Sequence, residues 1–310
     1  MFNVLTKKYF FNFLLKAPLI ILALFFSGCG QVEYITQSRL LMGTTVSISV
    51  ETNRSALADK AIAAAFCEIE RIEKVMSFFK ENSMLNELNK QAAVKPFKIS
   101  DELFYLIETS QKFSELTEGA YDVTASSLDE ANGYKKIILD KNRKTVFFKD
   151  KKVKIDLGGS AKGYAVDRAV EILRSHGFND ALVNAGGDIY ASGNYRKGKW
   201  AIGIRNPLKV DKIEDKIYLT NMAVATSGNY LRVHIIKTID NDKKFDVVSA
   251  TVIASECLEA DILATAVFAD PNIVMEVSES LDDIEVLLIK NIDGELKEVK
   301  TRGFIKSQVR

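Results

Sequence analysis

Asp261 and Thr265 are the pair of residues whose types and spacing best suit a chemical role. They lie four residues apart in a segment predicted to be a helix, capped by Ser255 and ending at Phe268, so their side chains share one face. A carboxylate and a hydroxyl on one face can hold a small, hard cation. In isolation, a solvated aspartate and a threonine bonded back to its own helix would be the ordinary interpretation. Apolar neighbours such as Ile262 instead indicate burial, and a buried carboxylate needs a partner.

A second candidate for chemistry is the glycine pair Gly158 and Gly159, which is followed by Lys162. Residues 153–155 before it are predicted to form a strand, and a helix is predicted after it, stopping at Gly177. A strand, a glycine turn and a helix point free backbone N–H groups towards an anion, and Lys162 in the first helical turn would add a positive charge. The spacing matches neither the Rossmann motif nor the P-loop. Many turns of this kind bind nothing, so the segment alone does not establish a site.

Four further segments accompany this turn in a characteristic order. They are Met-Gly-Thr at 42–44, Asn-Ala-Gly-Gly-Asp at 184–188, Ala-Thr-Ser-Gly-Asn at 225–229 and Glu-Ala-Asp-Ile-Leu-Ala-Thr-Ala at 259–266. The set resembles the ApbE family, the FAD:protein FMN transferases, from about residue 41 to residue 268. The resemblance implies an α+β fold in which mixed sheets and packed helices form two lobes around a flavin cleft. It also implies Mg²⁺-dependent transfer of FMN from FAD to a threonine hydroxyl of a target protein, with release of AMP.

The same resemblance implies roles for the residues that match the family's motifs. Asp261 would be catalytic by holding Mg²⁺, together with Thr265 and the backbone carbonyl of Gly159. The residues implied to contact FAD are Met42, Phe79, Gly119, Ala120, Tyr121, Asp156, Lys162 and Ile236. A place in the hydrophobic core is an equally good interpretation of Phe79. Asp188 fits a turn-stabilising role better than a catalytic one.

The segment that follows residue 229 departs from the family pattern. Relatives carry a His-x-Ile-Asp-Pro-x-Thr-Gly block, of which His234 and Ile236 match here, whereas Lys237 replaces the aspartate. His234 is either a base for the acceptor hydroxyl or an ordinary strand residue. The departure keeps open an FAD pyrophosphatase giving FMN and AMP, or a non-catalytic FAD-binding lipoprotein. A solute-binding lipoprotein unrelated to flavin is a third alternative, and the Asp261–Thr265 pair argues against it.

The first residues are typical of a bacterial secretion signal. Three lysines precede an apolar run at residues 17–26, which is followed by Ser-Gly-Cys at 27–29. The run is short for a membrane span, and its end resembles a lipobox with Cys29 as the lipidated residue. We therefore expect a signal peptide at 1–28, a lipid anchor and linker at 29–39, and the transferase-like domain at 40–310. This arrangement predicts a lipoprotein on the extracytoplasmic face of a membrane, bacterial inner membrane by preference, where the family's acceptors are subunits of redox pumps and other exported flavoproteins.

The amino-acid composition further restricts the partners and metal sites that can be expected. The net charge is +1 with acidic and basic residues interleaved, which argues against a nucleic-acid partner, and two histidines exclude a histidine-rich metal site. Hydrophobic spacing predicts long helices at residues 55–79 and 100–116, the latter capped by Ser100, and a β-hairpin at 137–148. Strands are predicted at 40–50, 181–183, 200–204, 222–226, 248–254 and 285–289. Cys67 and Cys257 could pair, although Cys67 fits a small buried residue on its helix.

Overall fold

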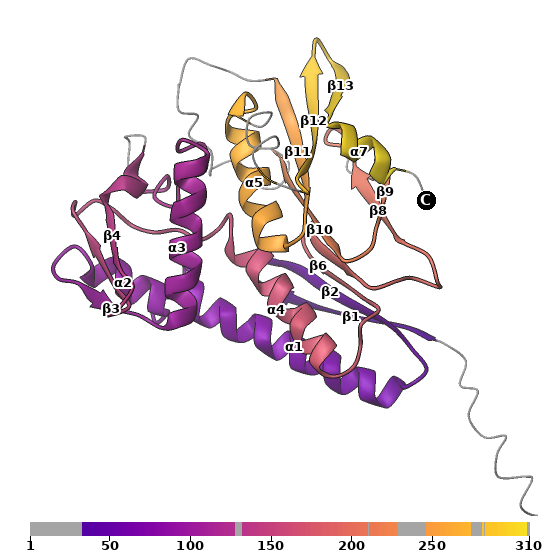
Figure 1. Ribbon diagram of the computed structural model, residues 1–310, viewed down its shortest axis with the longest axis horizontal. Coiled ribbons are helices and arrows are strands. Elements are labelled where there is room, and N and C mark those ends of the chain that lie inside the picture. The colour runs from indigo at the N-terminus through magenta and orange to yellow at the C-terminus, as the bar shows by residue number, and fades with distance from the viewer. Residues whose placement is uncertain are drawn as a thin grey trace, which may run out of the picture.

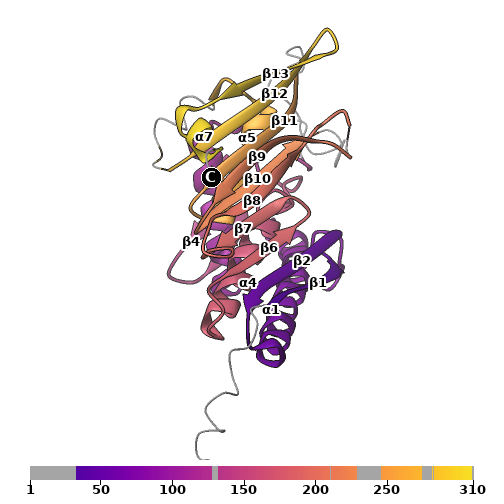
Figure 2. The same cartoon turned by 90° about the vertical axis from the view of Figure 1, so that its right-hand side faces the viewer.

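One large antiparallel sheet organises the part of the chain that the computed structural model describes, residues 33–127, 132–209, 211–228, 246–273, 281 and 283–308 (Figure 1). Its eight strands follow the spatial order β1-β2-β6-β7-β10-β11-β12-β13, and every neighbouring pair is antiparallel. Figure 2 shows the strands side by side in one twisted layer. The strands are β1 (Glu33–Leu41), β2 (Thr44–Thr52), β6 (Ala181–Ala185), β7 (Asp188–Ser192), β10 (Met222–Gly228), β11 (Val247–Ala254), β12 (Glu285–Ile292) and β13 (Glu295–Lys300).

Three helices, α1 (Ser55–Met76), α4 (Ala161–Ser175) and α5 (Cys257–Ala269), cover one face of this sheet. The first two are amphipathic and bury one stripe each, as the sequence predicts. Helix α5 is apolar on nearly all sides, because it packs against α3, α4 and the strands β10 and β11 at once. The main hydrophobic core lies between these helices and the sheet.

A smaller hairpin covers part of the opposite face. It consists of β8 (Trp200–Arg205) and β9 (Ile213–Leu219), and the short helix α7 (Arg302–Ser307) packs beside it. Trp200 and the fully buried Phe304 belong to a second hydrophobic core on this face. The sheet therefore separates two cores.

The remaining elements form a second lobe, seen to the left in Figure 1. Its elements are α2 (Met84–Gln91), α3 (Asp101–Leu116), the 3₁₀ turn η2 (Gly133–Lys136) and the small sheet of β3 (Phe97–Lys98), β5 (Thr145–Phe148) and β4 (Ile137–Asp140). Ser100 caps α3 by accepting a hydrogen bond from the N–H of Leu103 at 3.3 Å, as predicted. The α+β class is confirmed. Of the helices described, none combines the length and apolar character that crossing a membrane requires.

The N-terminal boundary differs from the prediction. Residues 33–39, expected to be linker, belong to strand β1, and the expected single strand at 40–50 is divided by a tight turn at Met42 and Gly43, which both have positive φ. Within the described ranges, strand β1 pairs only with β2 and is mostly exposed, so its sequence lacks the hydrophobic alternation by which strands are recognised. The folded domain therefore includes Glu33 and the rest of β1.

Two further local predictions are corrected. Residues 153–155 form no strand; the backbone N–H and C=O of Ile155 instead pair with the side chain of Asn89, at 2.8 and 2.9 Å. A side-chain amide thus replaces the strand neighbour that the sequence suggested. Cys67 is exposed on α1 and Cys257 is buried on α5, and both are free thiols.

Candidate functional site

The sheet brings segments that are far apart in the sequence to one of its ends. Strand β2 begins there at Thr44, β6 ends at Ala185, β7 begins at Asp188, and β10 ends at Gly228. The register explains this, because Val46 faces Ala185 across β2 and β6 while β7 and β10 run antiparallel beside them. Three of the sequence segments described above therefore meet at this end of the sheet.

Lys162, Asp188 and Asp261 form a cluster at this end of the sheet, here called the lysine cluster. The ammonium of Lys162 makes a close ion pair with Asp188 and lies 3.3 and 3.4 Å from Oδ1 and Oδ2 of Asp261. Both carboxylates are only 3% exposed. The backbone N–H of Gly163 also donates to Oδ2 of Asp261, at 3.0 Å. The predicted burial of Asp261 with a partner is confirmed.

The sequence interpretation missed the position of Asp188, which it treated as a turn residue. A charged residue directly after a glycine pair, at the start of a buried strand, was the available signal, because a buried aspartate requires a cation or several N–H donors. What the sequence did not reveal is that Lys162, 26 residues earlier, would supply that cation.

Thr265 lies one helical turn after Asp261, and its hydroxyl donates to the backbone carbonyl of Asp261 at 3.1 Å. This bond uses the hydroxyl proton and leaves oxygen lone pairs available on the same face. Gly159 packs closely here, since a Cβ at that residue would lie 3.0 Å from the Thr265 hydroxyl oxygen. Ser227 Oγ lies 3.5 Å from the same oxygen.

These oxygens suit a hard cation. Carboxylate, hydroxyl and carbonyl oxygens are the ligands that Mg²⁺ takes in proteins. Asp261 and Thr265 supply the first two, and Gly159, whose carbonyl the family resemblance assigns to the metal, packs against Thr265. Across the described residues, no three His, Cys, Asp or Glu side chains converge in a way that could hold a metal. A cation at this place would therefore depend on the threonine and the glycine as well as on Asp261.

Beside the lysine cluster lies a pocket rich in glycine and small residues, here called the glycine hollow. Gly119 lines it with φ of +90°, a conformation that favours glycine, and Asp156 holds the turn by accepting the N–H of Gly158 at 2.9 Å. Tyr121 lies in its wall, and burial raises the pKa of its phenol far above the ordinary value, so the phenol stays neutral. The lining residues are Gly119, Ala120, Tyr121, Asp122, Val123, Ala125, Ser126, Asp156, Gly158, Gly159, Thr265 and Ala269.

The structure thus brings together most of the residues that were expected to bind FAD or metal, with two differences. Met42 lies in the β1–β2 turn at the same end of the sheet but does not line the glycine hollow. Phe79 is 87% exposed in the connection between α1 and α2, which corrects the interpretation of it as a core residue. His234, Ile236 and Cys29 lie outside the described residues.

Known proteins that match this chain over nearly its whole length are named as flavin transferases. A curated relative named FAD:protein FMN transferase from Vibrio cholerae serotype O1 is 29% identical over 93% of this chain and 96% of its own length. One of the same name from Haemophilus influenzae is 26% identical over 89% and 92%. The solved structure of flavin transferase ApbE from Vibrio cholerae gives a TM-score of 0.79 at 27% identity, covering 89% of this chain and 100% of that chain.

A crystal structure of an ApbE protein from Thermotoga maritima gives a TM-score of 0.75 at 28% identity, covering 90% of this chain and 100% of that chain. The family model described as the ApbE family matches residues 42–288, a stretch that includes the glycine hollow and the lysine cluster. From this match and the shared fold it follows that the chain belongs to the ApbE family.

Proposed function

We propose that this chain transfers FMN from FAD to a threonine hydroxyl of an acceptor protein, with Mg²⁺ as cofactor. The observation that carries the proposal is the juxtaposition of the glycine hollow with the buried carboxylate of Asp261 and the half-buried hydroxyl of Thr265. Relatives that share the fold along nearly their whole length are named for this reaction. The small residues of the hollow let a ligand approach the backbone, which larger side chains would prevent.

Within this proposal the chain's residues orient and neutralise the pyrophosphate. Asp261, Thr265 and the Gly159 carbonyl would hold Mg²⁺, which when bound supplies positive charge to the phosphate oxygens. Lys162 carries a second positive charge next to the same place. Reactions at phosphorus depend mainly on positioning and charge stabilisation of this kind.

The proposed reaction is a substitution at the phosphorus of the FMN half. The acceptor hydroxyl oxygen forms the new P–O bond, the P–O bond to the AMP half breaks, and AMP leaves with the electron pair. The hydroxyl proton passes to a base, for which His234 is proposed. The acceptors proposed are exported flavoproteins, among them subunits of membrane redox pumps, which a lipid on Cys29 would allow the enzyme to meet at the extracytoplasmic face of the membrane.

The decisive experiment uses the full-length chain in detergent with FAD, Mg²⁺ and an acceptor domain that carries a threonine. We expect the intact mass of the acceptor to rise by one FMN phosphoester. The Asp261→Asn variant should lose transfer by roughly 100-fold or more, because one anionic ligand disappears. Asp270→Asn is the matched control, since Asp270 ends the same helix and bonds to Asn272 rather than to the lysine cluster.

Two other outcomes would contradict the proposal. Release of AMP and FMN with an unmodified acceptor would identify a pyrophosphatase, in which water takes the place of threonine. Transfer that survives Asp261→Asn and still requires Mg²⁺ would mean that the metal binds elsewhere.

A further inference from the structure

Asp167 on α4 is a half-buried carboxylate that the proposed reaction does not use. Its Oδ1 accepts the backbone N–H of Cys257 at 2.8 Å, and its Oδ2 accepts the backbone N–H of Leu258 at 2.8 Å. These are the first two N–H groups of α5, the helix that carries Asp261 and Thr265. A side chain of one helix therefore caps the start of another, 90 residues away in sequence.

Helix α5 has no side-chain cap of its own. Glu256 occupies the N-cap position without a capping hydrogen bond, and Ser255, the predicted cap, contacts the carboxylate of Glu259 at 3.5 Å instead. The first N–H groups of a helix lack partners within the helix and need an acceptor when they are buried. Asp167 is that acceptor, and its negative charge suits the positive end of the helix.

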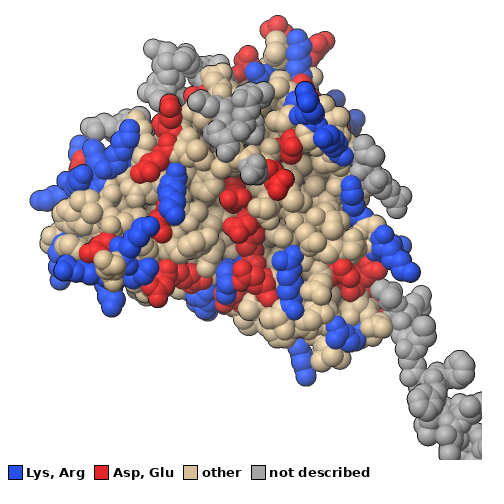
Figure 3. Space-filling model, viewed as in Figure 1, with Lys and Arg blue, Asp and Glu red and all other residues tan. Residues whose placement is uncertain are grey.

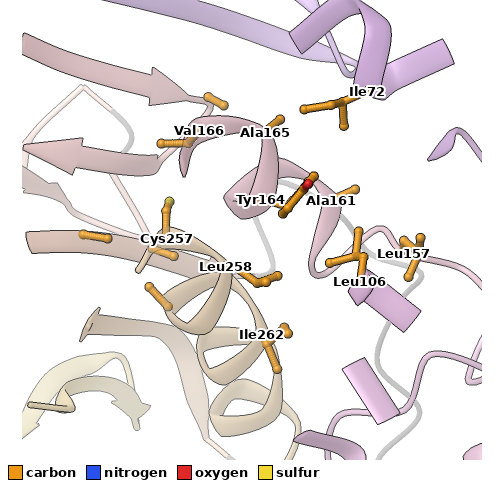
Figure 4. Packing of buried hydrophobic residues seen from close by; sticks show 14 of the residues in the cluster. Ile72, Leu106, Leu157, Ala161, Tyr164, Ala165, Val166, Cys257, Leu258 and Ile262 are labelled. Carbon is orange, nitrogen blue, oxygen red and sulfur yellow. The ribbon is translucent and has the colours of Figure 1, made fainter. Parts of the chain in front are cut away.

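The two helices are also in close contact one turn further along. A Cβ on Gly163 would lie 2.3 Å from the carbonyl oxygen of Cys257 and 2.9 Å from the Cβ of Asp261. Gly163 and Asp167 are four residues apart on α4, and Cys257 and Asp261 are four residues apart on α5. Each helix therefore meets the other at two successive turns (Figure 4), where Cys257 and Leu258 lie beside α4.

We propose that Asp167 is a positioning residue that fixes the Asp261–Thr265 face of α5 relative to α4. This inference rests on the proposed function, because it assigns the geometry of the same metal-holding oxygens. Removal of the Asp167 carboxylate frees the start of α5, so that Asp261 and Thr265 lose their fixed placement opposite Gly159 and Lys162. The second contact, at Gly163, joins α4 to α5 by one hydrogen bond, from its backbone N–H to Asp261, and leaves the first two N–H groups of α5 without the Asp167 acceptor.

Several titratable groups act on the Asp167 carboxyl. Burial raises its pKa to about 7, and the carboxylates of Glu256 on α5 and Glu171 on α4 act in the same direction, against the two N–H bonds from α5. Cys257 on α5 and Tyr105 on α3 also interact electrostatically with Asp167. The ionised form, which accepts both N–H groups fully, prevails above neutral pH.

The test measures metal affinity directly, by Mn²⁺ titration of the full-length chain at pH 8 with FAD present and the acceptor omitted, following free Mn²⁺ by EPR. In Asp167→Asn we expect the apparent Kd for Mn²⁺ to rise roughly 10-fold, the lower end of what outer residues of metal sites contribute. The difference from wild type should shrink at pH 6, because the amide resembles the protonated acid. Glu171→Gln is the matched control: it removes a nearby carboxylate that does not bond to α5.

A double variant separates positioning from simple stability. Glu256→Ser places a standard capping residue at the start of α5, so Asp167→Asn/Glu256→Ser should melt no lower than wild type while its Kd for Mn²⁺ stays raised. The double variant also serves if the single one does not fold. The inference is overturned if Asp167→Asn binds Mn²⁺ as wild type does, or if the local cap restores affinity together with melting temperature. A wild-type chain that binds no Mn²⁺ contradicts the proposed metal site itself, and the inference with it.

Discussion

Burial of a single carboxyl gives this protein a pH-dependent stability. The pKa of Asp167 is about 7 in the folded chain and near 3.8 when exposed, so protonation is favoured by folding. The protonated Asp167 carboxyl therefore favours the folded state. This contribution to stability is fully present below about pH 4 and is lost as the pH rises through about 7.

The corresponding prediction concerns the free energy of unfolding in urea between pH 5 and pH 8. It should fall with rising pH more steeply in wild type than in Asp167→Asn, which has no proton to lose at this position. Parallel pH profiles for the two proteins would show that the carboxyl titrates in the folded chain as it does in water.

Residue types indicated much of the chemistry before any fold was known. The spacing of Asp261 and Thr265 predicted one shared face, and their apolar neighbours predicted burial, both of which are confirmed. The partner of Asp261 could not be read from the sequence, because Lys162 is 99 residues away and approaches only through the contact between α4 and α5. Asp188 was missed for the same reason.

At the scale of elements, the close approach of α4 and α5 depends on one missing side chain. In an open helix, Gly→Ala usually stabilises by roughly 0.5–1 kcal/mol. For Gly163→Ala we predict the opposite sign, a loss of about 1–3 kcal/mol, because the new methyl group would overlap the Cys257 carbonyl. Chemical unfolding measures the difference. Gly198→Ala is the control, as its Cβ would meet its nearest neighbour at an ordinary 3.5 Å, and equal effects of the two substitutions would argue against tight packing.

Hydrophobic periodicity identified α1, α3 and α4 with their buried faces, because amphipathic helices carry that information locally. It failed for β1, whose exposed position at the edge of the sheet imposes no alternation, and for the start of α5, whose cap comes from Asp167. At the start of α5 a distant residue determines the local structure. In β1 the exposed edge leaves one side of the strand without a covering neighbour to impose a pattern.

At the scale of the whole molecule, the surface mixes charges of both signs on the face that can be seen. On the face seen in Figure 3, acidic and basic side chains are interspersed, with acidic ones gathered near the middle. A nucleic-acid-binding face would concentrate Lys and Arg in one patch. The partner proposed for this chain is instead a protein at a membrane surface.

Membrane attachment is tested by fractionating cells that express the full-length chain. We expect wild type in the membrane fraction and Cys29→Ser in the soluble or secreted fraction, since the lipid supplies the apolar anchor. Cys67→Ser, which changes an exposed thiol on α1, should remain with the membrane. Retention of Cys29→Ser at the membrane would contradict the proposed lipidation and favour an uncleaved apolar segment as the anchor.

With the proposed lipid on Cys29, the early start of strand β1 limits how far from the bilayer the enzyme can work. Four residue steps separate Cys29 from Glu33, which span at most about 14 Å of extended chain. The nine residues of β1 add about 30 Å. They end beside the turn at Met42, at the same end of the sheet as the lysine cluster. With the proposed lipid on Cys29, that end of the sheet stays within about 45 Å of the membrane surface. An acceptor protein must then present the residue to be modified within this short radius, whatever its affinity.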